Sequence, residues 1–421
     1  MIAIVGGGIT GLQTGWELDA RGIDFQVFES APCPGGAIRS AVVEGHVLDR
    51  GPQRIRLTGK MARMVEAVGL EDEVVRATPG LDLFIYRSGK LRTVPFSMAG
   101  LLRSDIVGPA SKLRLLLEPL TAGPDPEENV ADFFQRKLGK PLYEALVAPL
   151  YGGLYASDPA DMEVGTSLIH VLEEMGVSRS LLLPFLRRGG RVRPAPACTF
   201  RTGMQALPTA VAATLGERLK LDAPILALRR SGHGWRLTTE DGTVDAEQVV
   251  LTTPAPVAAK LLAEVSPQCA AAVTGLAYNP LAVVHLEAET NLEGFGFQVA
   301  FSEDLTLRGV TFNDSLFGRE NLYTAYLGGA RHPEVKEMPD QQLARLAVEE
   351  FRRCTGFDAR PLSVAHEVMP AWDLSWRTLK GFALPEGLHV AANWRSRPGL
   401  PGRLADAART AEEVARSCLP P

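Results

Sequence analysis

The sequence predicts an α/β (α+β overall) fold divided into two or three domains. The chain has 421 residues, more than one compact core usually contains. An apolar strand over residues 2–5 is followed by glycines, by a helical pattern over 10–21 and by a second strand over 24–29. Further strands are expected over 225–230, 234–239, 245–253 and most of 282–327, helices over 112–120, 129–137 and 341–354, and a last strand and helix over 387–392 and 403–417. This order predicts a sheet assembled from separated segments of the chain.

Composition and charge describe an ordinary globular protein. Hydrophobic residues make up 46% and charged residues 22% of the chain, and the net charge of −5 comes without a block of Lys and Arg, so nucleic acid is not an expected partner. The five cysteines are odd in number and far apart, which predicts free thiols rather than disulfides or a zinc site.

Two observations bear on localisation. The strand expected from residue 2 leaves no room for a signal peptide. The longest uncharged stretch, 265–286, is long enough for a membrane span, but its prolines and a histidine divide it into a helix end, a turn and a strand. We expect a cytoplasmic protein, and a peripheral contact at the inner face of the membrane stays open.

A glycine-rich loop follows the first strand. Gly6-Gly7-Gly8-Ile9-Thr10-Gly11 fits the pattern GxGxxG, in which the first glycine permits a tight turn, the second lets the backbone approach a pyrophosphate and the third lets helix and strand pack closely. Glu29, at the end of the second strand, can accept hydrogen bonds from ribose hydroxyls. The alternative for Glu29 is a surface carboxylate that caps the strand.

A second set of glycines favours FAD over NAD. Gly35-Gly36-Ala37-Ile38-Arg39 and Gly51-Pro52 follow Glu29 closely. Glycines at these places let the chain pass close to a long, extended dinucleotide, and NAD domains usually have no such segment. The sequence therefore predicts an FAD-binding domain of the Rossmann type.

These motifs resemble the flavin-containing amine oxidase superfamily, and others narrow the resemblance to the porphyrinogen oxidases (protoporphyrinogen/coproporphyrinogen oxidase). The superfamily motifs are Glu29-Ser30, the run 35–40 (GGAIRS) and Asp49-Arg50-Gly51-Pro52. The narrower ones are 149–159 (PLYGGLYASDP), 200–207 (FRTGMQAL) and 249–254 (VVLTTP). The resemblance covers nearly the whole chain.

The resemblance implies an FAD-binding domain over 1–75, 190–265 and 385–421, a helical insertion over 96–189 and a sheet-based substrate domain over 76–95 and 266–384. It also implies non-covalent FAD, with the Ile225 backbone at the adenine and the loop 399–402 bringing a helix N-terminus to the flavin. The residues expected along the cofactor are Gly6, Gly8, Ile9, Thr10, Gly11, Glu29, Ser30, Gly36, Ala37, Gly51, Pro52, Gln53, Arg54, Ile225, Trp372, Gly399, Leu400 and Pro401.

On the substrate side, Gly153 matches a glycine beside the substrate cavity, with a simple turn glycine as the alternative. Leu83 stands where several members carry an arginine that anchors a substrate propionate, and Ala37 replaces a larger residue. Arginines elsewhere are candidate anchors, and a solvated surface charge is the alternative for each of them. The candidates are Arg56, Arg87, Arg92, Arg187, Arg188, Arg191 and Arg193. A dispersed set of cations suits the four propionates of coproporphyrinogen III.

An apolar run over 181–186 precedes the last four of these arginines. A patch of this kind beside cations suits a membrane surface or a product-release edge. The other interpretation, which we favour, is the end of a core helix.

The implied activity is FAD-dependent oxidation of coproporphyrinogen III or protoporphyrinogen IX to the porphyrin in haem biosynthesis. Six electrons leave in three flavin cycles with O2 as acceptor, and flavin N5, not a protein side chain, carries the chemistry. No metal-ligand spacing occurs, and we expect the histidines to be structural, with His170 and His285 the hardest to dismiss. Hand-over of the product to ferrochelatase is an expected partnership, and both a monomer and a homodimer stay open.

Three other functions compete with this one. Many amine oxidases place a lysine near the flavin, but no lysine occurs over 261–335. A carotenoid desaturase shares the pattern of 398–402, and a porphyrin-binding flavoprotein with little turnover would explain Leu83 and Ala37. The segments PLYGGLYASDP and FRTGMQALP favour the porphyrinogen oxidases over the first two.

Overall fold

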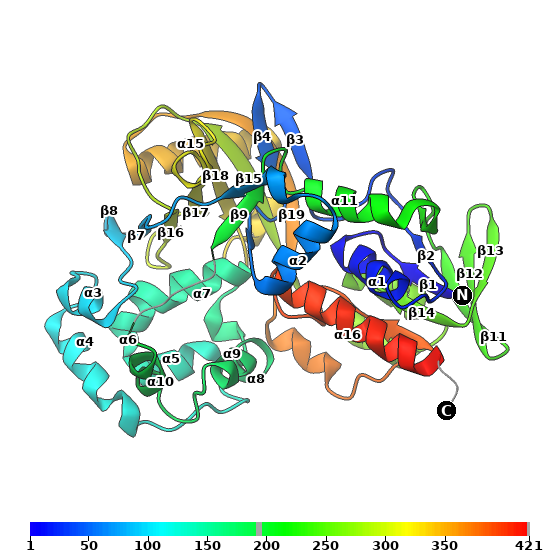
Figure 1. The fold of residues 1–421 in the computed structure, drawn as a ribbon. Helices are drawn as coiled ribbons and strands as arrows, with labels where there is room; N and C mark the ends of the chain where they lie inside the picture. Colours follow the sequence, from blue (N-terminus) through cyan, green and yellow to red (C-terminus); the bar gives the residue numbers. More distant parts are fainter. Residues whose placement is uncertain (191–195, 419–421) are drawn as a thin grey trace.

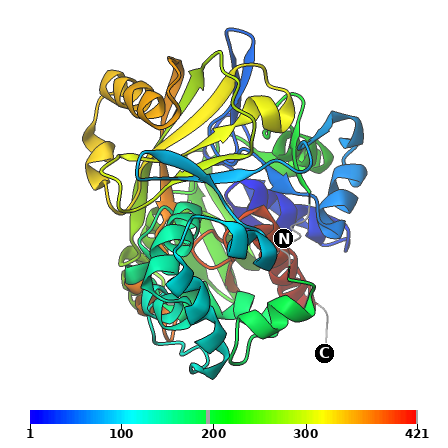
Figure 2. The same ribbon diagram turned by 90° about the vertical axis from the view of Figure 1, so that its left-hand side faces the viewer.

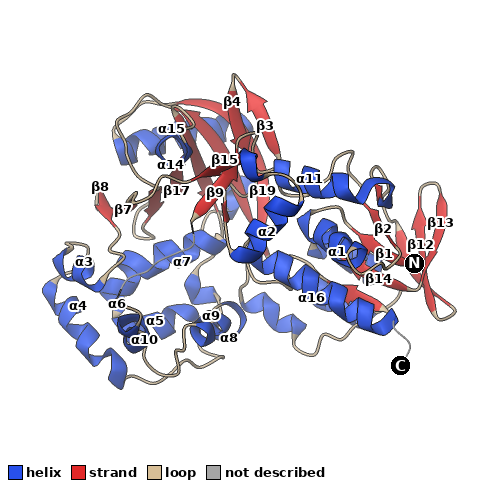
Figure 3. Ribbon diagram, in the orientation of Figure 1, coloured by secondary structure: helices blue, strands red, loops and turns tan. Residues whose placement is uncertain are grey.

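A computed structural model describes residues 1–190 and 196–418. Figure 1 shows three units, with a parallel sheet and its helices at the right, a seven-stranded sheet at the top and a group of helices at the lower left. In Figure 2 the helical unit lies below the seven-stranded sheet, and Figure 3 shows that the strands belong almost entirely to the other two units. The expected mixture of a Rossmann-type domain, a helical insertion and a second sheet is confirmed.

The parallel sheet combines segments from both ends and the middle of the chain. Its strands, in spatial order, are β10 (Leu219–Lys220), β2 (Phe25–Phe28), β1 (Ile2–Val5), β14 (Gln248–Leu251) and β20 (Leu388–Val390). One face is covered by α1 (Ile9–Asp19), α11 (Ala206–Leu215) and α16 (Leu400–Cys418). Alternate strand residues such as Ile4 and Val27 are fully buried against these helices.

The other face of this sheet packs against an antiparallel meander and two helices. These elements are β11 (Ala227–Ser231), β12 (Gly234–Thr239), β13 (Gly242–Ala246), α12 (Ala255–Leu262) and α13 (Pro267–Thr274). The single strand expected over 245–253 is therefore wrong. The chain is interrupted at Glu247 because β13 ends the antiparallel meander and β14 then enters the parallel sheet.

The second large sheet has seven strands. In spatial order they are β19 (Arg360–Pro370), β15 (Tyr278–Glu287), β18 (Leu322–Gly328), β17 (Leu307–Phe312), β16 (Gly296–Val299), β7 (Leu83–Arg87) and β8 (Lys90–Thr93). Helix α15 (Asp340–Thr355) packs Leu343, Ala347 and Phe351 onto one face. The opposite, open face is turned toward the helical unit and the parallel sheet, and helix α7 of the helical unit contacts it at β16 and β17.

The helical unit lies between β8 and β9 in the chain. Its helices are α3 (Met98–Arg103), α4 (Pro109–Arg114), α5 (Val130–Leu138), α6 (Lys140–Leu142), α7 (Ala148–Tyr155), α8 (Val164–Ser167), α9 (Ile169–Glu174) and α10 (Leu182–Arg187). The single helix expected over 112–120 is wrong. Helix α4 ends at Arg114, and the chain continues as a 3₁₀ helix, Leu115–Leu120, that contains Pro119.

Smaller elements join the units. They are the hairpin β3 (Ser40–Val43) and β4 (His46–Asp49), the small sheet β5 (Ile55–Arg56), β9 (Ala197–Phe200) and β6 (Val74–Arg76), and helices α2 (Gly59–Ala67) and α14 (Asn313–Phe317). Among residues 1–190 and 196–418, no helix is long and apolar enough to cross a membrane.

A buried ion pair holds the helical unit together. Lys137 on α5 and Glu118 in the 3₁₀ segment are both fully buried, and Nζ lies 3.2 Å from Oε1. The carboxylate also accepts from Ser180 Oγ at 2.5 Å and from the Leu181 amide at 2.9 Å, while Lys137 donates to the Arg179 carbonyl. These hydrogen bonds outweigh the opposing effect of burial and hold the pKa of Glu118 below its usual value, so the carboxylate is ionised.

Replacing Lys137 tests this pair. Lys137→Met should lower the free energy of unfolding by about 3–5 kcal/mol, because it leaves a buried carboxylate without its cation. Urea unfolding followed by circular dichroism measures the change. Lys140→Met, at an exposed lysine 3.7 Å from Glu144, is the matched control and should leave the midpoint nearly unchanged. Equal midpoints for the two variants would show that the pair does not stabilise the fold.

Candidate functional site

The glycine-rich loop packs as the motif predicts. Gly6 has a φ of +113°, and a Cβ there would lie 2.7 Å from Thr252 Oγ1. A Cβ on Gly11 would lie 1.9 Å from the Gly6 carbonyl oxygen, so any side chain would separate α1 from the loop. Thr252 fixes the loop from the neighbouring strand, because its hydroxyl donates to the carbonyls of Val5 and Gly6.

The N-terminus of α1 fits an anionic group. The helix begins directly after Gly8, with no side-chain cap and no acidic residue in its first turn. Its first N–H groups and the positive end of its dipole therefore stay available to a phosphate. A Cβ on Gly36 would lie 3.2 Å from Gly8 Cα, and Gly35 bridges to the loop, so the second glycine pair lies directly beside the first.

Glu29 faces this loop. Its side chain is buried and accepts from the Gly7 amide at 2.6 Å and from the Ala31 amide at 2.8 Å. Ser30 donates to the same carboxylate at 3.2 Å. The amide of Ala223, two residues before Ile225, donates to the Glu29 carbonyl at 2.8 Å. The Glu29 and Ile225 segments thus lie together, and the carboxylate is buried and oriented by the loop rather than exposed as a surface cap. Their contact with an adenosine stays a prediction.

Asp49 connects three parts of the chain behind the site. Its buried carboxylate accepts from Ser40 Oγ at 2.6 Å, from the Met204 amide at 2.7 Å and from Arg319 Nη1 at 2.8 Å. Gly203 permits this arrangement, since a Cβ there would lie 2.5 Å from Ser40 Oγ. The sequence motifs contain Asp49 and Gly203, but nothing in the local pattern indicates that Arg319 joins them.

The loop after Asp49 is tightly fixed. A Cβ on Gly51 would lie 1.9 Å from the Ala37 carbonyl oxygen, so the two predicted cofactor segments are in contact. Gln53 is buried, donates to the Asp49 carbonyl and accepts from Thr324 Oγ1 at 3.2 Å. Its side-chain amide is therefore used within the protein.

Neither of the two noted histidines shows a catalytic arrangement. His285 Nε2 lies 3.0 Å from the Asp49 carbonyl, and Nδ1 lies 2.9 Å from Ser363 Oγ. Burial lowers the pKa of His285 to about 4, so the ring is neutral and links structural groups. His170 is partly buried on α9, where burial lowers its pKa as well.

The aromatic segment after β19 is held in a strained conformation. Trp372 has a φ of +52°, which is uncommon for a non-glycine residue. The preceding Ala371 carbonyl accepts from Ser157 Oγ at 2.6 Å, and Ser157 accepts from Asn279 Nδ2 at 2.7 Å. The PLYGGLYASDP segment, which contains Ser157, thus positions the Pro-Ala-Trp segment.

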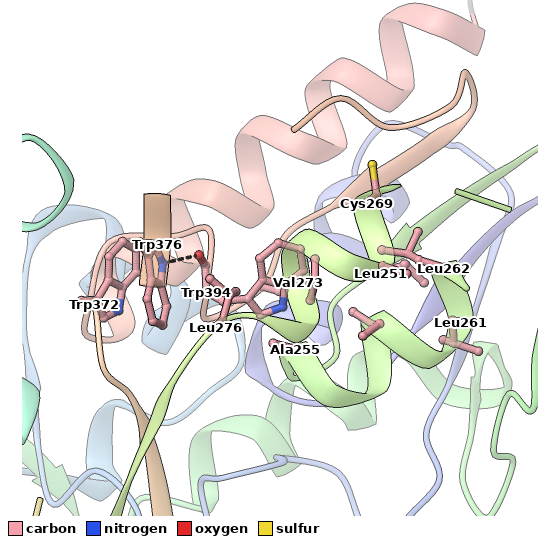
Figure 4. Packing of buried hydrophobic residues seen from close by; sticks show 14 of the residues in the cluster. Leu251, Ala255, Leu261, Leu262, Cys269, Val273, Leu276, Trp372, Trp376 and Trp394 are labelled. Carbon is pink, nitrogen blue, oxygen red and sulfur yellow. Dashed lines mark hydrogen bonds between the residues drawn. The ribbon is translucent and has the colours of Figure 1, made fainter. Parts of the chain in front are cut away.

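Three tryptophans join this segment to the parallel sheet (Figure 4). Trp372 stacks on Trp376 with ring centroids 5.2 Å apart, and Trp376 Nε1 donates to the Trp394 carbonyl at 3.0 Å. Trp394 Nε1 donates to the Thr253 carbonyl at 3.2 Å, next to the threonine that fixes the glycine loop. Trp394 thus links the segment before Gly399 to the strand that carries Thr252 and Thr253.

The C-terminal loop leads directly into α16. Gly399 has a φ of +84°, Leu400 is buried at the start of the helix, and Pro401 is exposed. A Cβ on Gly402 would lie 2.5 Å from the Arg397 carbonyl oxygen. The predicted approach of this helix end to the flavin stays a prediction.

Gly153 lies inside helix α7, so its interpretation as a turn glycine is wrong. A Cβ there would lie 2.3 Å from Gln298 Oε1 on β16. At the neighbouring Gly152, a Cβ would lie 2.5 Å from the Phe301 ring and 2.7 Å from the Ser157 carbonyl oxygen. Both glycines let α7 lie close to the open face of the seven-stranded sheet.

The predicted substrate arginines have different surroundings. Arg92 is paired with Asp105 on the edge strand β8, and Arg87 Nη1 donates to the Ile106 carbonyl at 3.5 Å. Arg56 is partly buried on β5. Arg188 donates to the Glu174 carbonyl and Arg187 is exposed, whereas Arg191 and Arg193 lie outside the described residues. Leu83 packs in an apolar cluster with Ile85 and Val94.

Residues 9–419 match the family described as flavin containing amine oxidoreductase. The chain belongs to this family. It is 30% identical to protoporphyrinogen oxidase 1, chloroplastic, of Spinacia oleracea over 393 residues, which cover 83% of this chain and 70% of that one. It is 29% identical to the chloroplastic protoporphyrinogen oxidase of Nicotiana tabacum over 391 residues, covering 83% and 71% of the two chains.

Solved structures show the same fold. The crystal structure of an Exiguobacterium protein, assigned as a protoporphyrinogen oxidase, has a TM-score of 0.79 at 21% identity and covers 99% of this chain and 98% of that one. The resemblance to the porphyrinogen oxidases is thus confirmed, and the chain is a flavin-dependent oxidoreductase.

The two adjacent glycines of α7 provide a test of its contact with the sheet. Gly153→Ala must displace the end of a flexible glutamine side chain, so we expect an altered KM for the substrate that reduces the flavin, retained flavin, and a Tm that falls by about 2 °C or less. Gly152→Ala meets a ring and a backbone carbonyl, so it should lower the free energy of unfolding by about 1–3 kcal/mol. Loss of stability in Gly153→Ala with unchanged kinetics would exclude a role for Gly153 at the substrate.

The interaction predicted for Glu29 can be measured on the apoprotein. Glu29→Ala should weaken flavin binding by about 1.5–3 kcal/mol, the value of a charge-assisted hydrogen bond. Glu29→Gln, which keeps the shape and loses the charge, should give an intermediate Kd. Titration of apoprotein with FAD, followed by quenching of flavin fluorescence, gives both values. Wild-type affinity in Glu29→Ala would place the adenosine elsewhere.

Proposed function

We propose that this chain is an FAD-dependent porphyrinogen oxidase of haem biosynthesis. The observation that carries the proposal is the similarity to protoporphyrinogen oxidases over 83% of the chain. The link between Ser157 and the Ala371 carbonyl supports it, because the most specific porphyrinogen oxidase motif then shapes the segment expected beside the flavin.

The flavin is proposed to be non-covalent FAD. The uncapped N-terminus of α1 supports a pyrophosphate, and the carboxylate of Glu29 beside the loop supports a ribose with free hydroxyls. The approach of Gly36 to Gly8, and of Gly51 to Ala37, supports a cofactor that extends beyond the first dinucleotide-binding turn.

Bound FAD would accept two electrons in each cycle, so removal of six hydrogens from a porphyrinogen would take three cycles and reduce three O2 to three H2O2. The chain's own residues would hold the macrocycle and exclude water. The apolar cluster of Ala156, Leu281 and Val283, with Tyr326 and Met369 against it, supports this role on the open face of the sheet. Aromatisation drives the reaction, so no strong protein base is required.

A peripheral membrane contact is proposed for the helical unit. Leu113, Leu116 and Leu120 are 66%, 72% and 72% exposed and lie close together in the chain, at the end of α4 and in the 3₁₀ helix that follows it. Leu183 and Leu186 on α10 are exposed too, so the interpretation of this run as the end of a core helix is wrong for these two side chains. Exposed Arg103 and Arg187 add positive charge, which suits an anionic lipid surface.

Anaerobic reduction of the flavin tests the proposed activity. Coproporphyrinogen III or protoporphyrinogen IX should bleach the visible absorbance of the flavin, and O2 should restore it with formation of porphyrin. Putrescine serves as the comparison, because a solved putrescine oxidase has the same fold with a TM-score of 0.71. Bleaching by the amine, with no response to either porphyrinogen, would establish amine oxidation instead. Acid precipitation should release FAD into the supernatant.

A further inference from the structure

Arg54 is a partly buried cation that has no carboxylate partner among the described residues. Its guanidinium lies over the Phe295 ring, 4.2 Å from the centroid, and Nη1 lies 3.5 Å from Thr311 Oγ1. Within residues 1–190 and 196–418, no carboxylate oxygen lies within 4.0 Å of it. A guanidinium has five N–H donors, so one contact at the outer limit of hydrogen-bond distance leaves most of them unused.

The surroundings of Arg54 do not supply a compensating negative charge. Burial raises the pKa of Tyr326, the titratable group beside Arg54, so this phenol stays neutral. Arg56 is near enough to lower the pKa of Arg54 further, in addition to the larger effect of burial. Arg319, by contrast, is paired with Asp49 at 2.8 Å. The region around Arg54 is thus electropositive and favours an anion.

The register of the seven-stranded sheet places this cation opposite α15, on the open face. Thr311 pairs with Gly296, and Gly296 pairs with Leu83 on the next strand. Residues paired in this way share a face of the sheet, so Arg54 contacts the face to which Leu83 belongs. Thr311 lies two strands from Leu83, about 10 Å away. An arginine side chain can span much of that distance.

The same face carries the contact of helix α7. Gln298, which lies against Gly153, pairs with Gly309, and Gly309 pairs with Tyr326 beside Arg54. The guanidinium therefore shares this face with the glycine expected at the substrate and with the leucine that occupies the position of an anchoring arginine in related sequences.

We propose that Arg54 is the residue that binds a carboxylate of the substrate. It would supply the positive charge that is missing at Leu83. The inference rests on the proposed function. The position of Arg54 after Gly51-Pro52 suggested that it lies along the cofactor, and we assign it to the substrate instead. Its side chain points to the substrate sheet at Phe295 and Thr311, whereas the phosphate loop is served by α1. Phe295 is a positioning residue that fixes the plane of the guanidinium.

The test compares a charged with an uncharged substrate in the flavin-loaded enzyme. For wild type, kcat/KM for a porphyrinogen should exceed that for its methyl ester, which has no carboxylates. Arg54→Met should reduce this preference by roughly 10- to 150-fold, mainly through KM, which corresponds to one charge-assisted hydrogen bond. Arg54→Lys, which keeps the charge without the fork of donors, should recover part of it.

Arg218→Met is the matched control. Arg218 also lies over a phenylalanine, 5.0 Å from the Phe25 centroid, but it is paired with Asp19 at the C-terminal end of α1. This variant should keep the wild-type preference for the acid.

Two outcomes would overturn the proposal. One is an unchanged ratio of acid to ester in Arg54→Met. The other is a variant that folds but is purified without flavin, which would return Arg54 to the cofactor. Binding of the stable porphyrin and its ester, followed by quenching of tryptophan fluorescence, gives the same comparison without turnover. The wild-type enzyme could also oxidise no porphyrinogen, while Arg54→Met loses the preference for binding the acid over the ester. This result would refute the proposed activity but support Arg54 as the residue that binds a carboxylate.

Discussion

The carboxylate of Asp49 is the constraint on which the arrangement of the site depends. It is buried and accepts hydrogen bonds from Ser40, from the backbone at Met204 and from Arg319. These donors come from the first sixth, the middle and the last third of the chain. A buried carboxylate is costly unless it is paired and hydrogen-bonded, so the chain segments that satisfy it are held in one arrangement. The loop that carries Gly51 and Arg54 begins directly after it.

Buried charges are used in two different ways in this protein. Glu118 and Lys137 satisfy each other within the helical unit, and Asp49 and Arg319 do so between the two sheet-based units. Arg54 is held by an aromatic ring and a hydroxyl instead. Pairs of the first kind stabilise the fold, whereas a cation without an internal counter-ion has donors available for a ligand. Charges that are paired within the protein can thus be distinguished from a charge that is available to a ligand.

The features that could be predicted from the sequence are those that depend on short stretches of chain. The strand, glycine loop and helix at the N-terminus need only a particular order of small and apolar residues, and Gly6, Gly11 and Glu29 have the contacts that this order implies. Helix ends and strand ends were predicted to within a few residues where a cap or a turn marks them. The family motifs then extended the prediction to the whole fold.

What the sequence did not reveal depends on contacts between distant residues. Asp49 and Arg319 are 270 positions apart, and no local pattern indicates that they meet. Arg54 was assigned to the cofactor because it follows Gly51-Pro52, but its surroundings are decided by a phenylalanine and a threonine more than 200 residues later. A turn was one interpretation of Gly153, whereas it lies inside helix α7, close to Gln298. Such facts follow from the packing of α7 and the two sheets.

The discontinuous parallel sheet has a consequence for how the protein is made. Its central strand β1 and helix α1 leave the ribosome first, whereas β20 and α16, which packs against α1, come last. At the usual rate of synthesis, about 20–80 s separate the two ends of the sheet. During that time the apolar side of α1 lacks the helix that covers it, and the C-terminal loop that borders the expected flavin site does not yet exist. A cofactor that uses this loop would therefore be bound only after α16 has been synthesised, and until then α1 exposes apolar side chains that α16 covers in the folded protein.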